Sequence, residues 1–402
     1  MRASRAFLSF LLLLFACGAL AQAQPGGVQA VQRLLRDRPK DPALWFYLAR
    51  FDAEAADAKG CVAALDRVEA LGDGFLPARE LGFAKVWDDP AFQAVRARLE
   101  ARLPRLDYAP TAIELPDRGL LPEGIAYDSH ARLFFIGSVA EHRILRVTDA
   151  QEVSEFAGAS AGLDSVLGLT VDGPRRRLYA VSTTAVAHPA STPRRNAIFA
   201  FDLVTGRLLR RIEVPQAKQL NDVAVAPGGR VYASDSESGA VFEIPEHGEP
   251  RAVVPPGALR GSNGIAASPD ARRLYVATST GLAVVDLVGG SVKPMPAPRR
   301  DNLAAIDGLY QWQGSLIGVE NTTNPGRVVL VTLSRDGESV TGVQTLLSHH
   351  HPALAEPTTG AVGTKNFYLL AATGLGHLRP DGRIDDPDAV PRPLVLRLPL
   401  PR

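Results

Sequence analysis

The spacing of hydrophobic residues changes near residue 108. Before it, apolar side chains recur every three or four positions, a period that predicts amphipathic helices. After it, short segments alternate apolar and polar residues and are separated by turns rich in Gly, Asp and Pro, which predicts β-strands. We therefore expect a small helical region over residues 24–105 and a larger all-β domain over residues 108–402.

The helical region carries recognisable start signals. Asp41 and Asp89 each stand directly before a proline, Pro42 and Pro90. An aspartate can cap the free backbone N–H groups of a helix whose first residue is proline. The paired amphipathic helices resemble a tetratricopeptide-type hairpin. One such hairpin cannot bury both of its faces alone, so we expect it to dock on the domain that follows.

One motif repeats six times in the β region. Each copy reads as a strand, a turn and a second alternating strand, and one column of the stacked copies contains Gly124, Gly168, Asp222, Gly264, Gly308 and Gly360. A spacing of 42 to 54 residues fits one four-stranded blade. The repeat predicts a mainly β fold, a six-bladed β-propeller preceded by a small α-helical, tetratricopeptide-like region. Residues 112–115 and 394–398 are expected to complete a shared last blade.

The column just before the glycines is rich in oxygen-bearing side chains: Glu123, Leu167, Asn221, Asn263, Asp307 and Thr359. In a closed ring, equivalent positions on the innermost strands face the axis at one height. Buried carboxylates repel one another unless a cation lies between them. An all-oxygen set favours a hard cation, Ca²⁺ before Mg²⁺ or Mn²⁺, with Zn²⁺ as a further divalent candidate. The alternative is that these residues only form turns where strands begin.

Four segments carry a family resemblance: EGIAY, LNDVAVAPGGRVYASD, SNGIAASPDARRLYVA and IDGLYQWQGSL. They resemble the gluconolactonase/regucalcin-like (senescence-marker-type) six-bladed propellers and, more distantly, paraoxonases and strictosidine synthase-like proteins. The resemblance covers about residues 110–400. It implies one divalent ion, usually calcium, in the central channel. It also implies Glu123, Asn263 and Asp307 as ligands, with Asn221 as a ligand or a substrate contact.

Two positions depart from the family pattern. Glu123 is followed by Gly124-Ile125-Ala126, where the family often has Gly-Pro and then Trp. Gln219 stands where members that hydrolyse sugar lactones often carry Arg. We expect Gln219 to contact the substrate, and the departure leaves the choice of lactone open.

Loops on the metal-bearing face supply further candidates. In an antiparallel meander, the loops that enter the first strand and join the second and third strands share one face. These loops contain six candidates for the pocket mouth: Glu141, His142, His188, Asp235, Glu320 and Asn321. Asp307, or a water that it orients, is the candidate general base, and His142 and His188 are further candidates that suit the task near neutral pH. For each, the alternative is a solvated loop residue. Residues 183–196 form a long loop and a candidate lid. The run of residues 349–351, three histidines, is interpreted as solvated loop.

Composition and targeting signals set the context. The 44 Lys and Arg nearly balance the 43 Asp and Glu, so the chain lacks the positive charge typical of nucleic-acid-binding proteins. The first 23 residues read as a signal peptide, with an apolar run over residues 7–16 and a cleavage pattern at 21–23. Lipoprotein processing at Cys17 is the alternative. Removal of this segment leaves Cys61 as the single cysteine. We therefore expect a periplasmic or secreted protein with no transmembrane span and no internal disulfide.

These features predict an exported, Ca²⁺-dependent hydrolase of lactones or esters, with the metal in the central channel polarising the substrate carbonyl. The partner would be a small-molecule substrate, with a protein partner conceivable for the helical region. The alternative is a non-catalytic, metal-stabilised propeller that acts as a binding protein.

Overall fold

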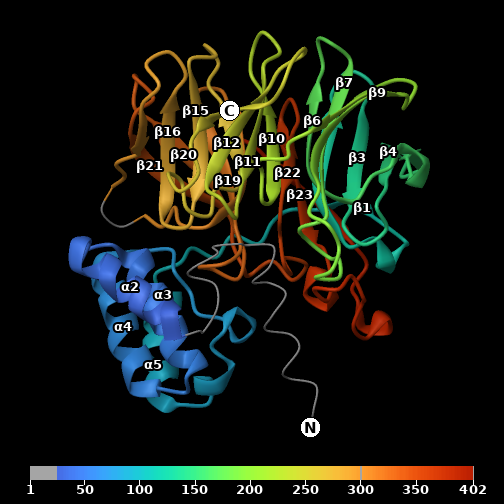
Figure 1. Cartoon of the computed structure of the whole chain (residues 1–402). Coiled ribbons are helices and arrows are strands. Elements are labelled where there is room, and N and C mark those ends of the chain that lie inside the picture. Colours follow the sequence, from blue (N-terminus) through green and yellow to red (C-terminus); the bar gives the residue numbers. More distant parts are fainter. Residues whose placement is uncertain (1–24, 299–300, 402) are drawn as a thin grey trace.

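The computed structural model describes residues 25–298 and 301–401 and shows a helical unit beside one end of a β-propeller (Figure 1). The predicted signal peptide lies outside these residues. The α-helices of the described residues are α2 (Pro25–Asp37), α3 (Pro42–Glu54), α4 (Ala58–Leu71) and α5 (Pro90–Glu100). Short 3-10 turns are η2 (Arg79–Leu81), η3 (Ala84–Val86), η4 (Arg118–Leu120), η5 (Ala159–Ala161), η6 (Leu375–His377) and η7 (Pro387–Ala389).

The predicted helix caps are confirmed. The Asp41 carboxylate accepts hydrogen bonds from the backbone N–H groups of Ala43 and Leu44 at the start of α3. Asp89 accepts one from Phe92 N in α5. In both helices proline is the first residue, where its missing N–H costs nothing because that group has no partner inside a helix.

The strands of the described residues form six four-stranded sheets, which are the blades. Blade 1 contains β2 (Pro122–Asp128), β3 (Leu133–Ser138), β4 (Ile144–Thr148) and β5 (Val153–Ala157). Blade 2 contains β6 (Ser165–Asp172), β7 (Arg177–Thr183), β8 (Asn196–Asp202) and β9 (Leu208–Glu213). Blade 3 contains β10 (Leu220–Val225), β11 (Val231–Asp235), β12 (Ala240–Ile244) and β13 (Arg251–Val254).

The other blades follow the same order. Blade 4 contains β14 (Ile265–Ala267), β15 (Arg273–Thr278), β16 (Gly281–Asp286) and β17 (Val292–Pro294). Blade 5 contains β18 (Ile306–Trp312), β19 (Ser315–Glu320), β20 (Arg327–Leu333) and β21 (Val340–Leu347). Blade 6 contains β22 (Gly360–Val362), β23 (Asn366–Ala372), β24 (Leu394–Pro399) and β1 (Thr111–Glu114).

The ring closes through blade 6, as predicted. Strand β1 pairs antiparallel with β24, with Thr111 opposite Leu396 and Glu114 opposite Leu394. The first strand of the propeller is therefore the outermost strand of its last blade. Closure of this kind leaves no long unpaired sheet edge, and the predicted fold class, a six-bladed propeller preceded by helices, is confirmed.

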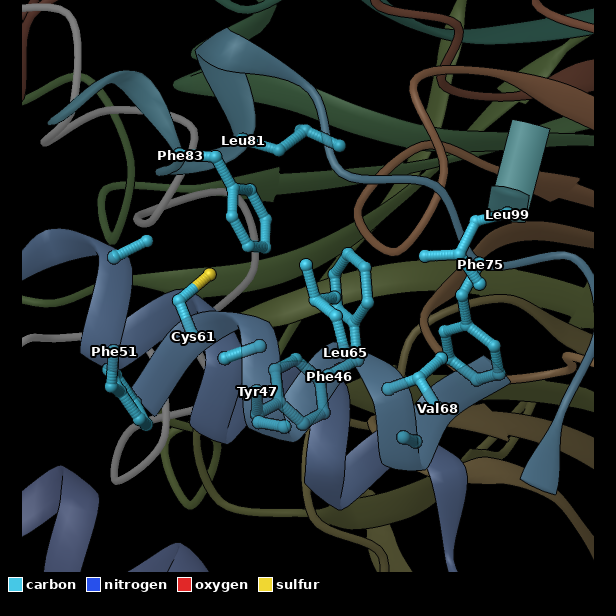
Figure 2. Close-up of a cluster of buried hydrophobic side chains, with 14 of the residues drawn as sticks. Phe46, Tyr47, Phe51, Cys61, Leu65, Val68, Phe75, Leu81, Phe83 and Leu99 are labelled. Carbon is cyan, nitrogen blue, oxygen red and sulfur yellow. The ribbon is translucent and has the colours of Figure 1, made fainter. Parts of the chain in front are cut away.

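The helical unit has a core of its own. Figure 2 shows Phe46, Leu65 and Phe75 turned toward one another between the helices. The ring of Phe46 lies 5.5 Å from those of both Phe75 and Phe83, centroid to centroid. Cys61 is a free, buried thiol in the same core. Such aromatic contacts stabilise the fold beyond the burial of apolar surface. The helical unit is therefore stabilised by its own core as well as by its contacts with the propeller.

The helical unit docks on loops of blades 4 and 5. The Tyr47 hydroxyl donates to the backbone carbonyl of Ser279 at 2.7 Å, and Leu76 N donates to Thr323 O at 3.0 Å. The Asn324 side-chain amide donates to Gly74 O at 3.0 Å. These partners lie at one end of the propeller, so the helices cover part of one face of the ring (Figure 1). Among the described residues, no helix is both long and apolar enough to cross a membrane.

Candidate metal and substrate site

The polar column lies in a row of β-bulges. The pairing of the innermost strand with its neighbour shifts register between Pro122 and Ile125 in blade 1, and between Ile306 and Leu309 in blade 5. The same shift occurs in β6 and β10. A bulge inserts one unpaired residue and redirects its side chain. The column residues Glu123 and Asp307 both lie inside such a shift.

Glycine allows neighbouring inner strands to approach closely at this height. A methyl group added to Gly124 would stand 2.1 Å from the carbonyl oxygen of Leu167. One added to Gly264 would stand 2.4 Å from the carbonyl oxygen of Asp307. Glycine is therefore sterically required at these two positions, whereas blade 3 has Asp222 at the equivalent place.

Asp307 is the centre of the polar cluster. Its Oδ1 accepts a hydrogen bond from Asn263 Nδ2 at 2.8 Å, and its Oδ2 accepts one from Asn321 Nδ2 at 2.7 Å. Asn321 also donates to the Pro357 carbonyl at 2.6 Å. Blades 4 and 5 and the loop that enters blade 6 are thus joined at a single carboxylate.

Glu123 approaches this cluster from blade 1. Its backbone carbonyl accepts hydrogen bonds from the hydroxyls of Thr358, at 3.0 Å, and Thr359, at 2.5 Å. Its side-chain Oε2 is buried and has no hydrogen-bond partner among the described residues. A buried carboxylate oxygen without a donor is costly, so this atom marks the place where a positive ligand fits.

Three acidic groups share this interior. Burial raises the pKa of Glu123 well above its usual range, and the charges of Asp307 and Asp222 raise it further. Burial raises the pKa of Asp307 to about 7, although the amides of Asn321 and Asn263 favour its ionised form. Burial also raises the pKa of Asp222 to about 7. The three cannot all ionise at neutral pH without a compensating cation.

The donor set fits a hard divalent cation. Glu123 and Asp307 supply carboxylate oxygens, and Asn263, whose Nδ2 is committed to Asp307, has a carbonyl oxygen to offer. Oxygen ligands of this kind suit Ca²⁺, Mg²⁺ or Mn²⁺. Asn221 is buried in the bulge of β10, next to Asp222 in sequence. The prediction that these four residues are ligands stays a prediction.

A cavity of about 650 Å³ opens over Glu123, Asp307 and Asn321. One wall comes from the helical unit, with Ala78, Glu80, Leu81, Trp87 and Arg96. The opposite wall comes from loops of blades 5 and 6, with Pro325, His349, Leu354, Ala355, Glu356, Thr358, Thr373, Leu375, His377 and Pro391. The predicted carboxylates therefore form the floor of a mainly apolar cavity bounded by both parts of the chain. A small organic molecule fits such a space.

The loop residues predicted at the pocket mouth lie in different environments in the structure. Asn321 lines the cavity and bonds to Asp307. Glu320 is instead fully buried and forms a two-pronged ion pair with Arg327, at 2.7 and 3.0 Å. Asp235 is also fully buried, and it accepts from the backbone N–H groups of residues 218, 219, 237 and 238. Glu320 and Asp235 therefore hold loops in shape and are not open pocket groups.

Two further predicted pocket residues lie in other surroundings. Glu141 is exposed and pairs with Arg143, which also bonds to Asp117. Gln219 is buried at the start of blade 3, where its N–H donates to Asp235 and its carbonyl accepts from Ser236. Their predicted contact with a substrate stays a prediction.

His142 and His188, from loops of blades 1 and 2, meet each other. Their rings are stacked with centroids 4.9 Å apart. Burial lowers the pKa of both, which keeps the imidazoles neutral near pH 7. The cavity over Asp307 is lined by other residues, so a catalytic role for this pair stays a prediction. The loop over residues 183–196 is held by Thr184, which bonds to the backbone of Arg195 and Pro193.

Sequence reasoning missed several cavity residues. His377, in η6, lines the cavity, and its Nδ1 lies 3.1 Å from the carbonyl oxygen of Asp385. The histidines of residues 349–351 are half-buried and contact other groups, so the interpretation as solvated loop is wrong. No local signal marks these residues as cavity lining, because the cavity forms only where the helical unit meets loops of blades 5 and 6.

Residues 121–301 match the family described as the SMP-30/Gluconolactonase/LRE-like region. This match confirms the resemblance seen in the sequence over that part of the propeller. No curated protein matches the chain.

Solved structures share the architecture. The Malassezia sympodialis allergen Mala s 1 aligns with a TM-score of 0.56 at 14% identity, over 72% of this chain and 96% of its own. The Xanthomonas campestris gluconolactonase XC5397 aligns with a TM-score of 0.48 at 18% identity, over 74% and 95%. The PQQ-bound aldose sugar dehydrogenase of Streptomyces coelicolor gives 0.49 at 17%, over 72% and 96%. At 14% identity the likeness to Mala s 1 shows the fold alone.

Proposed function

We propose that this protein is a divalent-cation-dependent hydrolase of lactones or esters. The observation that carries the proposal is the unpartnered Oε2 of Glu123, buried beside Asp307 at the floor of the cavity. The family match over residues 121–301 supports the same class of activity. Within that class, the apolar cavity wall favours a substrate with a hydrophobic part.

Glu123, Asp307, Asn263 and Asn221 would hold the cation, with Ca²⁺ the first candidate. A cation with open positions would polarise the substrate carbonyl and stabilise the oxyanion that forms there. The amides of Asn263 and Asn321 orient the Asp307 carboxylate and favour its ionised state. Leu81 and Trp87 of the helical unit and Leu354 and Leu375 of the propeller would surround the hydrophobic part and exclude water.

His377 is a further candidate base, because it lines this cavity. The Asp385 carbonyl can only accept a hydrogen bond, so the neutral ring carries its proton on Nδ1. A neutral imidazole can act as a general base toward an attacking water. Glu356 lines the same cavity, and burial raises the pKa of that carboxyl. Asp307, His142 and His188 are the competing bases.

The test is hydrolysis of a panel of lactones and aryl esters by protein treated with a chelator and then reloaded with Ca²⁺, Mg²⁺, Mn²⁺ or Zn²⁺. We expect activity to vanish on chelation and to return with one of these ions. Glu123→Gln and Asp307→Asn should abolish it, whereas Glu338→Gln, at an exposed turn of blade 5, should not. Activity that survives both chelation and Asp307→Asn would exclude the proposal. Metal-dependent stability without any turnover would favour a binding protein.

We also propose that the protein acts after export, because residues 1–23 have the charge, apolar run and cleavage pattern of a signal peptide. The test is fractionation of cells that express the whole chain, followed by mass determination of the purified protein. A mature N-terminus after Ala23 in the exported fraction supports the proposal. A lipid-modified Cys17 would indicate the lipoprotein route, and an intact N-terminus inside the cell would contradict export.

A further inference from the structure

A second group of metal-binding side chains lies between the helical unit and the propeller. Glu100 is the last residue of α5, and His349 and His350 belong to the loop between β21 and β22. Each of the three offers one ligand atom, and these atoms all lie within 4.8 Å of one another. Glu100 is about 250 residues from the histidines in the chain, so docking of the helical unit creates the cluster.

The spacing within the cluster suits a small transition-metal ion. His349 Nε2 lies 3.3 Å from Glu100 Oε1. Metal–ligand distances of about 2.0–2.2 Å in a tetrahedral site separate neighbouring ligand atoms by about 3.3–3.5 Å. The centroids of the His349 and His350 rings are 4.1 Å apart. Successive side chains of an extended strand point to opposite sides, so this loop has brought two adjacent imidazoles to one side.

The loop is held in place by the segment that joins the helices to the propeller. Ser348 N donates to Leu106 O at 2.8 Å, and Leu106 N donates to Ser348 Oγ at 3.1 Å. His351, the third histidine, is occupied elsewhere: its Nε2 lies 2.9 Å from the Ala109 carbonyl. These contacts fix the backbone on both sides of His349 and His350. Metal binding would therefore cost little further conformational entropy in this loop.

Outer contacts orient the ligands as well. Ser348 Oγ lies 3.0 Å from His350 Nδ1 and so sets the orientation of that ring. Arg96 donates to Glu100 Oε2 at 2.8 Å, while Oε1 faces His349. Metal-binding histidines and carboxylates in proteins are commonly held by such secondary hydrogen bonds. His349 Nδ1 is buried and has no hydrogen-bond partner within the described residues.

The chemistry of the three side chains is also suitable. Two imidazoles and one carboxylate favour Zn²⁺ and related ions, whereas Ca²⁺ prefers oxygen ligands alone.

We propose that Glu100, His349 and His350 form a binding site for a transition-metal ion of the Zn²⁺ class that ties the helical unit to the propeller. A water or a substrate group would fill the fourth position. His349 also lines the cavity over Asp307, so the ion would sit at the rim of that cavity. The site is distinct from the carboxylate cluster and does not depend on the proposed hydrolase activity.

The test uses the whole chain, prepared without a polyhistidine tag and stripped of metal. Zn²⁺ is titrated by calorimetry with excess Ca²⁺ present, so that the carboxylate cluster is occupied by a hard ion. We expect one Zn²⁺ per chain and a higher melting temperature on loading. His349→Ala and His350→Ala should each weaken binding at least tenfold, and Glu100→Gln should also weaken it. His247→Ala, at an exposed turn of blade 3, and Asp307→Asn should bind Zn²⁺ like the unchanged protein.

Co²⁺ provides an independent readout, because nitrogen ligands in a tetrahedral site give visible absorption bands that should disappear in His349→Ala. Absence of saturable Zn²⁺ binding would overturn the proposal. So would wild-type affinity in the His349→Ala/His350→Ala double variant, or loss of Zn²⁺ binding in Asp307→Asn alone. Circular dichroism checks the fold of each variant. If the histidine variants do not fold, Glu100→Gln decides, since unchanged Zn²⁺ affinity there also contradicts the site.

Discussion

Asn263 donates its side-chain amide hydrogen to Asp307 across 2.8 Å and so connects blade 4 to blade 5 at the floor of the cavity. Asn321 makes the matching bond to the other oxygen of the same carboxylate. Both amides lie on loops or bulges at the ends of strands, and both are buried. Two donors on one carboxylate fix its orientation before any ligand arrives, which is the arrangement that a selective cation site requires.

The first prediction concerns Asn263. Replacing it with Ala removes the amide that orients Asp307 and one candidate ligand oxygen. We expect cation affinity to fall about 10- to 100-fold, as is common when a group supporting a metal ligand is lost. Calorimetric titration with Ca²⁺ measures this. Asn366→Ala, on the middle strand β23 of blade 6, is the matched control and should bind Ca²⁺ normally. If both variants bind Ca²⁺ with equal affinity, Asn263 is not part of the cation site.

The second prediction is a pH dependence of the metal-free protein. Because burial raises the pKa of Asp222 and Asp307 to about 7, and that of Glu123 above its usual range, the folded state favours the protonated carboxyls. Their contribution to stability is complete below the unfolded-state pKa of about 4 and is lost as pH rises through about 7. The metal-free protein should therefore become less stable over this range of pH.

The measurement for this prediction is the melting temperature with a chelator and with Ca²⁺, at a series of pH values. We expect the two values to lie close together near pH 4 and to separate by several degrees toward about pH 8, where the ionised carboxyls need the cation. Histidines and other groups titrate in both samples, so the difference isolates the metal-linked part. A difference that stays constant across this range would show that the three carboxyls do not share one site.

The third prediction tests the close approach of the inner strands. A methyl group on Gly264 would meet Asp307 O at 2.4 Å and Leu309 N at 2.5 Å, both backbone atoms that cannot rotate away. Gly264→Ala should therefore lower stability by about 1–3 kcal/mol and weaken Ca²⁺ binding through displacement of Asp307. Gly173→Ala is the control, since nothing lies within 4 Å of its added methyl group. Urea denaturation measures both, and equal stability of the two variants would contradict the steric argument.

Local signals were enough to predict much of the architecture. The six-fold repeat marked the inner strands, because the glycine column is required wherever neighbouring strands approach closely. Asp41 and Asp89 marked helix starts, because their capping bonds reach only two or three residues along the chain. The strands that close the ring, β1 and β24, could be predicted because a strand was left over at each end of the repeat.

The residues that line the cavity could not be predicted as completely as the strands. Glu320 was assigned to the pocket mouth, but it is paired with Arg327, and no sequence pattern distinguishes a buried ion pair from an exposed one. In blade 6 the cavity is lined by Thr358, one residue before the predicted column position Thr359. Trp87 and His349 reach the cavity only through docking of two regions distant in sequence.

The last prediction assigns the helical unit a part in substrate binding. Trp87 lines the cavity and lies under the Arg96 guanidinium, 5.2 Å from its ring centroid. Trp45 of the same unit lies under Arg67 at 5.4 Å and is not among the residues that line the cavity. The two tryptophans therefore share a unit and a type of contact and differ in access to the cavity.

Trp87→Ala should raise KM for the best substrate of the panel about tenfold or more, because a buried aromatic contact contributes about 1.5–3 kcal/mol, and should change kcat little. A raised KM with an unchanged kcat indicates that the lost contact stabilised the bound substrate and the transition state equally. Trp45→Ala should lower the melting temperature about as much as Trp87→Ala does, but should leave KM unchanged. If both variants raise KM equally, the effect comes from weakened folding of the helical unit. If neither does, the helical unit covers the propeller without contacting the substrate.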